Sequence, residues 1–226
     1  MSPATGELAL SPARRTAFRA ACAELAALDD AEFGARLLAR TPTHENRDPA
    51  RLLRWAEAAT AFGTELAAAE GPYEGPAGPY AEPRAGHGTP RVVEREGGVE
   101  RLLLARYVSR PAPAVELYAD TLALGEEVVG LLGWREWFPV GAVRRAALAH
   151  EEAHCLLHGD RTLRRALRER LGHTALRLGR HRMTGHVAGA DELAAHGYAA
   201  ARCGLGRTPL LLTAALARAV RALEED

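Results

Sequence analysis

Residues 71–90 divide the chain into two parts, because this segment contains five prolines and five glycines in twenty positions. Proline lacks a backbone donor and glycine has the largest conformational freedom, so neither a helix nor a central strand forms at that density. We therefore expect a linker or an extended loop over residues 71–90. This places an N-terminal helical region in residues 1–70 and the main folded domain in residues 91–226.

The charge balance narrows the classes of function. The chain of 226 residues has 29 arginines, 29 acidic residues and no lysine, so its formal net charge is zero. Nucleic-acid and membrane-surface binders generally need a basic excess, so we expect neither partner. No apolar run approaches the ~18 residues of a membrane span, and the first residues lack the pattern of a signal peptide. The three cysteines form no CxxC pair, which favours a reducing compartment such as the cytoplasm.

Helix signals dominate outside the expected loop, and strand signals are confined to one stretch. That stretch predicts a hairpin of strands 91–94 and 101–108 about Gly97-Gly98, followed by a third strand at 114–118. Helices are expected before residue 70 and, after the strands, at about 121–132, 140–158, 161–171, 190–203 and 209–224. Helices, a small sheet of about three strands and further helices, in this order, predict an α+β, helix-dominant fold.

The helix expected at 140–158 contains an H-E-x-x-H motif that runs from His150 to His154. Residues four apart in a helix lie on one face, so both imidazoles can bind a single ion. Glu151 is displaced from that line by one residue, where its carboxylate can accept a proton from a water bound to the metal. The motif therefore predicts a Zn²⁺ site with Glu151 as the general base.

A catalytic zinc site normally has three protein ligands and one water, so a third ligand is needed. Our first candidate is Glu192, at the start of a later helix. Asp191 presents a similar carboxylate, and His158 and His196 each lie four residues from a proposed ligand, so these alternatives stay open. The 37 residues between the motif and Glu192 are expected to form a helical hairpin that returns the chain to the metal.

Two short motifs resemble those of the ImmA/IrrE-type zinc metallopeptidases, within the gluzincin group. The first is His150-Glu151-Glu152-Ala153-His154 with His158, and the second, Glu192-Leu193-Ala194-Ala195-His196-Gly197-Tyr198-Ala199, is similar to the family's E-x-E-A-N-x-F-A helix start. The resemblance covers residues from about 92 to 212 and implies a zincin-like fold, with a small sheet, a metal-site helix and flanking helices. It also implies zinc ligation by His150, His154 and Glu192, a general base at Glu151, and a peptide or protein substrate.

Other residues leave the function open. Tyr198 is a candidate catalytic group that faces the cleft and stabilises an oxyanion, and the alternative is a tyrosine of the core. Glu152 places a charge inside the motif, and Ala194 and His196 replace the family's second glutamate and its asparagine.

Two hypotheses follow: a zinc-dependent metallopeptidase, and a non-catalytic metal-binding regulatory or interaction protein with the same fold. Neither hypothesis specifies a substrate sequence or an oligomeric state.

The helix expected at 161–171 carries four arginines on one face, at positions 161, 164, 165 and 168. Such a face is usually solvated or paired with acids such as Glu169. An anionic partner is the alternative.

Overall fold

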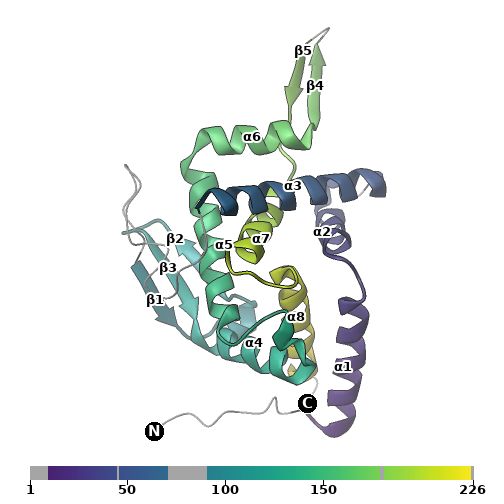
Figure 1. Ribbon diagram of the computed structural model, residues 1–226, viewed down its shortest axis with the longest axis vertical. Coiled ribbons are helices and arrows are strands. Elements are labelled where there is room, and N and C mark those ends of the chain that lie inside the picture. Colours follow the sequence, from purple (N-terminus) through teal and green to yellow (C-terminus); the bar gives the residue numbers. More distant parts are fainter. Residues whose placement is uncertain (1–9, 45, 71–90, 179–180, 225–226) are drawn as a thin grey trace.

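The computed structural model describes residues 10–44, 46–70, 91–178 and 181–224, so the loop expected at 71–90 lies outside the described residues. The described residues form eight α-helices, five β-strands and three short 3-10 helices (Figure 1). The 3-10 helices are Pro42–His44, Val99–Arg101 and Trp134–Glu136. In chain order, the other elements are α1 (Pro12–Ala26), α2 (Asp30–Ala39), α3 (Pro49–Glu70), β1 (Arg91–Arg95), β2 (Ala105–Val108), β3 (Ala114–Tyr118), α4 (Ala119–Leu132), α5 (Ala142–Gly159), α6 (Arg161–Leu171), β4 (Thr174–Leu178), β5 (His181–Thr184), α7 (Ala190–Arg202) and α8 (Pro209–Glu224).

The predicted α+β, helix-dominant fold is confirmed, and local signals account for many of the helix ends. The Ser11 side chain accepts a hydrogen bond from the backbone N–H of Arg14 at the start of α1. Asp29 and Glu32 form a reciprocal capping box at the start of α2. Gly172 ends α6 in the left-handed conformation, with a φ of 59°, which glycine adopts without strain.

The three-stranded sheet has the order β1–β3–β2, with β3 parallel to β1 and antiparallel to β2. The expected hairpin between strands 91–94 and 101–108 is therefore wrong, because β3 lies between them. The burial pattern agrees with this order: in β3, Val115 and Leu117 are fully buried, whereas the two outer strands have only partly buried and exposed residues.

The turn after β1 is anchored on α4 and does not close a hairpin. The Asp120 carboxylate accepts hydrogen bonds from the backbone N–H groups of Gly97, Gly98 and Val99, at 2.9–3.2 Å. Burial acts to raise the pKa of Asp120, but these hydrogen bonds outweigh it and lower the pKa. The anchored turn directs the chain to the other side of β3, where β2 packs beside α5.

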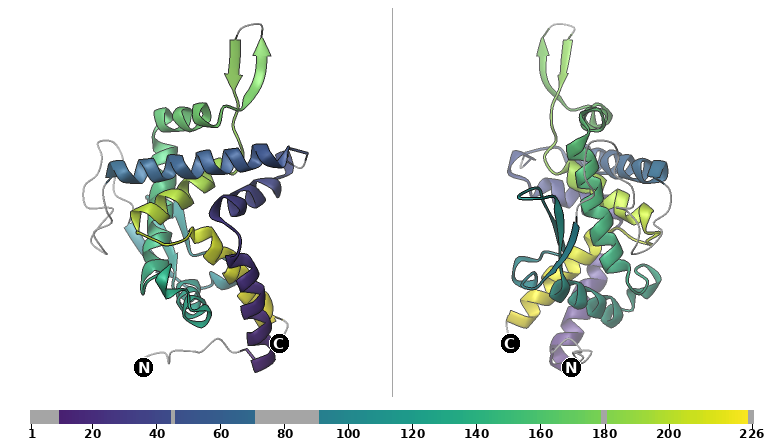
Figure 2. Two further views of the ribbon diagram at one scale, coloured as in Figure 1. Left: turned by 45° about the vertical axis from the view of Figure 1, so that its right-hand side comes forward. Right: turned by 90° about the vertical axis from the view of Figure 1, so that its left-hand side faces the viewer.

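A second, two-stranded sheet corrects the prediction for the segment between α6 and α7. Its strands β4 and β5 form an antiparallel hairpin that projects from the rest of the molecule (Figures 1 and 2). The expected helical hairpin is therefore wrong in its second half, although α6 is present. The alternation Leu176-Arg177-Leu178 is typical of a strand, but leucine and arginine are also good helix formers, which explains the error.

The N-terminal helices pack directly on the C-terminal ones. α3 lies across α7, and α1 packs along α8 (Figure 2). The α3–α7 crossing is closest at two glycines. A Cβ on Gly63 would lie 1.8 Å from the Ala194 carbonyl oxygen, and a Cβ on Gly197 would lie 2.3 Å from the Thr60 carbonyl oxygen. The helices of residues 12–70 therefore help to position α7.

The helices share an apolar core. Phe18 of α1, Val115 of β3, Val143 of α5 and Leu212 of α8 belong to one buried cluster. A second cluster joins α3 to α7 and includes Trp55. Among the described residues, no helix combines the length and the apolar character needed to cross a membrane.

Candidate metal centre

Two helices face each other at the candidate metal centre, α5 with the H-E-x-x-H motif and α7 with Glu192. On α5, His150 and His154 project from the same face, and their Nε2 atoms are 3.1 Å apart. α7 begins directly after Gly189, which has a φ of 84°. Its first turn directs Glu192 at α5, and His196 follows one turn later on the same face.

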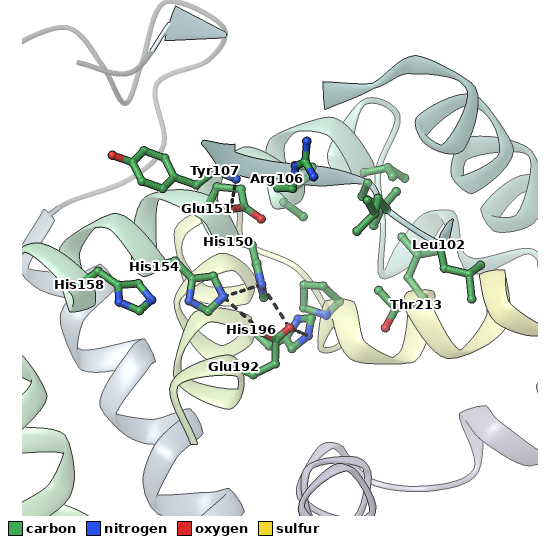
Figure 3. Close-up of a pocket in the computed structure, with 18 residues that line it drawn as sticks. Leu102, Arg106, Tyr107, His150, Glu151, His154, His158, Glu192, His196 and Thr213 are labelled. Atoms are coloured by element: carbon green, nitrogen blue, oxygen red, sulfur yellow. Dashed lines mark hydrogen bonds and ion pairs between the residues drawn. The ribbon is translucent and has the colours of Figure 1, made fainter. Parts of the chain in front are cut away.

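The Glu192 carboxylate lies among three imidazoles (Figure 3). Its Oε1 atom is 3.2 Å from His150 Nε2 and 3.3 Å from His196 Nε2, and its Oε2 atom is 3.3 Å from His154 Nε2. The structure thus brings together the three residues that the sequence analysis selected as ligands. It also adds His196, whose side chain is 8% exposed and which the sequence analysis left as an alternative. We refer to these four residues as the metal cluster.

The charges of the metal cluster depend on one another. Burial lowers the pKa of the His150 imidazole, and the neighbouring His196 ring adds to this effect. Burial acts to raise the pKa of Glu192, but hydrogen bonds from the three imidazoles outweigh it and hold that pKa far below its usual range. Burial opposes protonation of His154, yet the Glu192 carboxylate raises its pKa overall. The metal cluster therefore contains an ionised carboxylate among imidazole nitrogens, a donor set that suits a divalent cation.

The distances in the metal cluster fit a single ion. With metal–ligand bonds of about 2.0–2.1 Å, the ligand atoms of a tetrahedral zinc site lie roughly 3.3–3.4 Å apart. The separations among His150, His154 and Glu192 are 3.1, 3.2 and 3.3 Å. The Nδ1 atoms of His150 and His196 are buried and have no hydrogen-bond partner within the described residues, so the polar contacts of both rings are on the Nε2 side. The residues present therefore fit a zinc ion.

A second group of candidate ligands overlaps with the metal cluster. Ligand atoms of His154, His158 and Asp191 all lie within 4.8 Å of one another. His154 is shared, because its Nε2 atom is also 3.3 Å from Glu192. Around Glu192, the separations of 3.1–3.3 Å match the edge of a tetrahedral zinc site, which is roughly 3.3–3.4 Å. The group around Glu192 is therefore the better candidate.

Glu151 lines the same cavity as the metal cluster, on the side of β2. Its Oε2 atom accepts a 2.9 Å hydrogen bond from the backbone N–H of Tyr107, a contact that joins positions 44 residues apart and that no sequence pattern predicted (Figure 3). The cavity has a volume of about 440 Å³. A ligand in this cavity lies between β2 and the metal cluster. The apolar part of the lining consists of Leu102, Leu103, Leu104, Ala105, Val143, Ala146, Ala147, Pro209 and Leu212.

The structure does not bring Tyr198 to the cavity, so the expectation that this side chain faces the cleft is wrong. Its side chain is fully buried, and its hydroxyl accepts a 3.4 Å hydrogen bond from Nε of Arg202. Burial raises the pKa of this phenol, and the nearby Glu152 carboxylate adds to the effect. The core alternative for Tyr198 therefore agrees with the structure.

Glu152, the charged residue inside the motif, is also directed away from the cavity. Its side chain is 13% exposed, and its carboxylate lies 4.0 Å from Nε of Arg202. The two residues pair α5 with α7 on the side where Tyr198 is buried. The charge of Glu152 is thus balanced by Arg202 and does not enter the metal cluster.

Geometry defines a candidate metal centre with a carboxylate base beside it. No protein-family model matches the chain, no curated protein matches it, and no solved structure matches it. The resemblance to the ImmA/IrrE-type metallopeptidases therefore stays a hypothesis that depends on the two motifs. The function of the centre is inferred from its own residues and their geometry.

Proposed function

We propose that the chain is a zinc-dependent metallopeptidase whose metal ligands are His150, His154 and Glu192. One observation carries this proposal: these three side chains converge at 3.1–3.3 Å, and Glu151 lines the same cavity. The ImmA/IrrE resemblance supports it, because the residues that converge are those of its two motifs. The proposed substrate is a peptide or protein segment.

The chemistry divides between the ion and the protein. When bound, a zinc ion lowers the pKa of a water molecule and polarises the carbonyl of the scissile bond. Glu151 acts as the general base: it takes a proton from the attacking water and later delivers a proton to the nitrogen of the leaving amine. The N–H of Tyr107 holds one oxygen of the Glu151 carboxylate, and the other oxygen remains available for the proton.

The outer edge of the three-stranded sheet supports binding of an extended peptide. β2 is an outer strand, and residues 102–107 line the cavity beside the metal cluster. An outer strand presents backbone groups with which an extended segment can pair. The apolar lining of the cavity favours substrates with an apolar side chain near the scissile bond.

A non-catalytic metal-binding protein is the second candidate function, and His196 is the observation that favours it. Its Nε2 atom is 3.3 Å from Glu192, so four side chains converge where a catalytic site needs three. Four protein ligands complete a tetrahedral site, as in structural zinc centres, and leave no position for water.

Metal content, measured by mass spectrometry on protein without a histidine tag, tests the site first. We expect about one zinc per chain in the wild type and in Glu151→Gln, and loss of zinc in His154→Ala and Glu192→Ala. His173→Ala is the matched control, because this histidine lines a different cavity and its loss should leave the zinc in place. Zinc retained by Glu192→Ala excludes this residue as a ligand. A wild type that stays metal-free after reconstitution with zinc excludes both candidate functions.

Cleavage of a peptide library, followed by mass spectrometry, then separates the two functions. If the chain is a metallopeptidase, the wild type cleaves peptides, whereas the Glu151→Gln variant keeps its zinc and does not cleave them. Zinc binding without cleavage of any peptide, together with weaker zinc binding in His196→Ala, favours the non-catalytic function.

A further inference from the structure

A second cavity lies at the start of α3 and at the connection from α6 to β4. Its volume is about 410 Å³, and it shares no lining residue with the cavity beside the metal cluster. Arg47, Arg51 and Arg54 line one side, and Arg170 and His173 line the other. Among the described residues, the lining contains no carboxylate. This cavity is termed the arginine pocket.

Three guanidinium groups of the arginine pocket have no ion-pair partner in the part of the chain that the structure describes. Arg47, Arg51 and Arg54 are exposed and form no ion pair with any residue that the structure describes. Arg170 differs, because its guanidinium binds both carboxylate oxygens of Glu65, at 2.6 and 2.7 Å. Arginine stays protonated in proteins, so the pocket permanently holds three positive charges without an ion-pair partner among the described residues.

Asp48 is the acidic residue next to Arg47 in sequence. Its Oδ1 atom accepts a 3.2 Å hydrogen bond from the Ala50 N–H at the start of α3, and it forms no ion pair with the three arginines. The His173 imidazole reflects the positive surroundings: burial lowers its pKa, and the charges of Arg47 and Arg51 lower it further.

The two sides of the pocket are held together by Trp55, whose side chain is 5% exposed. Its indole Nε1 donates a 3.0 Å hydrogen bond to the Leu171 carbonyl, and its ring lies 5.2 Å from the His173 ring. The Arg51 guanidinium lies 5.9 Å from the centre of the indole. The floor of the pocket is thus preformed, which reduces the entropy lost when a ligand binds.

The sequence places further positive charge beside the pocket. Residues 161–186 contain eight arginines and a single acidic residue, Glu169, a formal charge of +7 that the rest of the chain balances with −7. This segment forms α6 and the hairpin β4–β5, which together project at one end of the molecule (Figure 1). The net charge of the whole chain is zero, but this end of the molecule is strongly basic. The overall charge balance is therefore a weak argument against nucleic acid as a partner.

We propose that the arginine pocket binds phosphate groups. Guanidinium groups match phosphate geometry and bind its oxygens through charge-assisted hydrogen bonds. Three uncompensated guanidinium groups can neutralise one phosphate monoester or two linked phosphates. The volume of about 410 Å³ suits a phosphorylated small molecule, since small-ligand pockets span roughly 300–1,000 Å³. A nucleic-acid backbone carries the same chemistry and is the other source of the phosphate.

Isothermal titration calorimetry with pyrophosphate tests the proposal on the full chain. We expect saturable binding by the wild type at low salt, and binding at least about tenfold weaker in the double variant Arg51→Ala/Arg54→Ala. Arg165→Ala is the matched control. It removes an arginine of α6 that pairs with Glu169 outside the pocket, so binding should be unchanged. Thermal melting verifies that the variants are folded.

Three outcomes overturn the proposal. The first is the absence of saturable binding to the wild type. The second is an equal loss of affinity in Arg165→Ala, since overall charge would then explain the binding. The third is equally tight binding of a polyglutamate peptide, which carries negative charge without phosphate.

A short single-stranded oligonucleotide identifies the source of the phosphate. Tighter binding than pyrophosphate, weakened by the double variant, assigns the pocket to a nucleic-acid backbone. Pyrophosphate binding at least as tight as that of the oligonucleotide assigns it to a phosphorylated small molecule. Both results support phosphate recognition by the arginine pocket.

Discussion

The metal cluster and the arginine pocket are both built from ionisable side chains on helices, but they balance charge in opposite ways. In the metal cluster, one carboxylate lies 3.2–3.3 Å from each of three imidazoles. In the arginine pocket, three guanidinium groups face a cavity without a carboxylate among the described lining. The first arrangement suits a cation, and the second suits an anion from outside the chain.

The two sites differ in charge balance because one lies at a helix–helix interface and the other on an exposed helix face. The metal cluster occupies the interface of α5 and α7, where each helix contributes two side chains four residues apart. A buried charge is costly unless it is paired, so an interface of this kind brings carboxylate and imidazole together. Arg51 and Arg54 lie on the exposed face of α3, where no described residue forms an ion pair with them and solvent lowers the cost of unpaired charge.

α3 lines the arginine pocket and α7 carries two residues of the metal cluster, so we expect Gly197→Ala, at the crossing of the two helices, to have the largest effect. The added Cβ would lie 2.3 Å from the Thr60 carbonyl oxygen, and the helix backbones must separate. We expect the free energy of unfolding, measured by urea denaturation, to fall by about 3 kcal/mol. Zinc content should fall with it, because α7 carries two residues of the metal cluster.

Gly130→Ala is the matched control for this prediction. A Cβ there would lie 3.6 Å from its nearest neighbour, a nitrogen of the flexible Arg135 side chain. Alanine is a better helix former than glycine, so this variant should be as stable as the wild type or up to about 1 kcal/mol more stable. Equal stability of Gly197→Ala and the wild type would contradict the role of the crossing.

His196→Ala should affect the metal cluster alone. If this ring binds the ion, the Kd for zinc should rise by about 10- to 100-fold, as measured by competition with a chromophoric chelator. Pyrophosphate binding should stay unchanged, because His196 does not line the arginine pocket. An unchanged Kd would leave three ligands and support the catalytic function.

Asp120→Asn should weaken the turn that leads to β2, the wall beside the metal cluster, and leave the arginine pocket intact. The free energy of unfolding should fall by about 1–2 kcal/mol, since the lost charge-assisted hydrogen bonds are partly screened by solvent.

The effect of Asp120→Asn should depend on pH. Folding lowers the pKa of Asp120, because hydrogen bonds from backbone N–H groups outweigh burial, which raises it. The carboxylate therefore stabilises the fold above its unfolded pKa of about 3.9, and this contribution is lost as the pH falls through the folded-state pKa. Urea denaturation should show the largest difference between wild type and variant at neutral pH and a smaller one in acid. A difference that grows in acid would contradict this account.

Glu65→Gln should have the smallest effect and concern the arginine pocket alone. The carboxylate binds the exposed Arg170, and such surface pairs contribute little to stability, so the Tm should not change measurably. Its removal frees a fourth guanidinium group, so titration calorimetry should show pyrophosphate binding a few-fold more tightly. Weaker binding would show that Glu65 positions Arg170 for the ligand.

Much of the metal cluster was predictable because its geometry repeats along helices. His150 and His154, like Glu192 and His196, are spaced by four residues, and this spacing places side chains on one face. Capping residues and glycines marked several helix ends, and the helices expected at 161–171 and 209–224 have the bounds observed for α6 and α8. These signals all act over a few residues.

The sequence-based predictions were wrong where the structure depends on packing between segments that are distant in sequence. The strands at 91–94 and 101–108 are adjacent in sequence, yet β3 separates them and carries the more deeply buried side chains. Tyr198 lies within the motif of α7 but is buried at the α5–α7 interface beside Arg202. The local sequence pattern shows neither result, because the burial of a residue depends on segments that are distant in sequence and pack against it.

The sequence by itself determined the helices, the histidine pair of α5 and the acidic start of α7, because propensity and periodicity act between near neighbours. Only the tertiary structure decided that Glu151 contacts the N–H of Tyr107, 44 residues away, and that Glu152 is balanced by Arg202. It also decided that Trp55 holds α3 to the end of α6 across 116 residues, which creates the arginine pocket. Such contacts form when the chain buries its apolar surface, and no local pattern specifies which distant groups then meet.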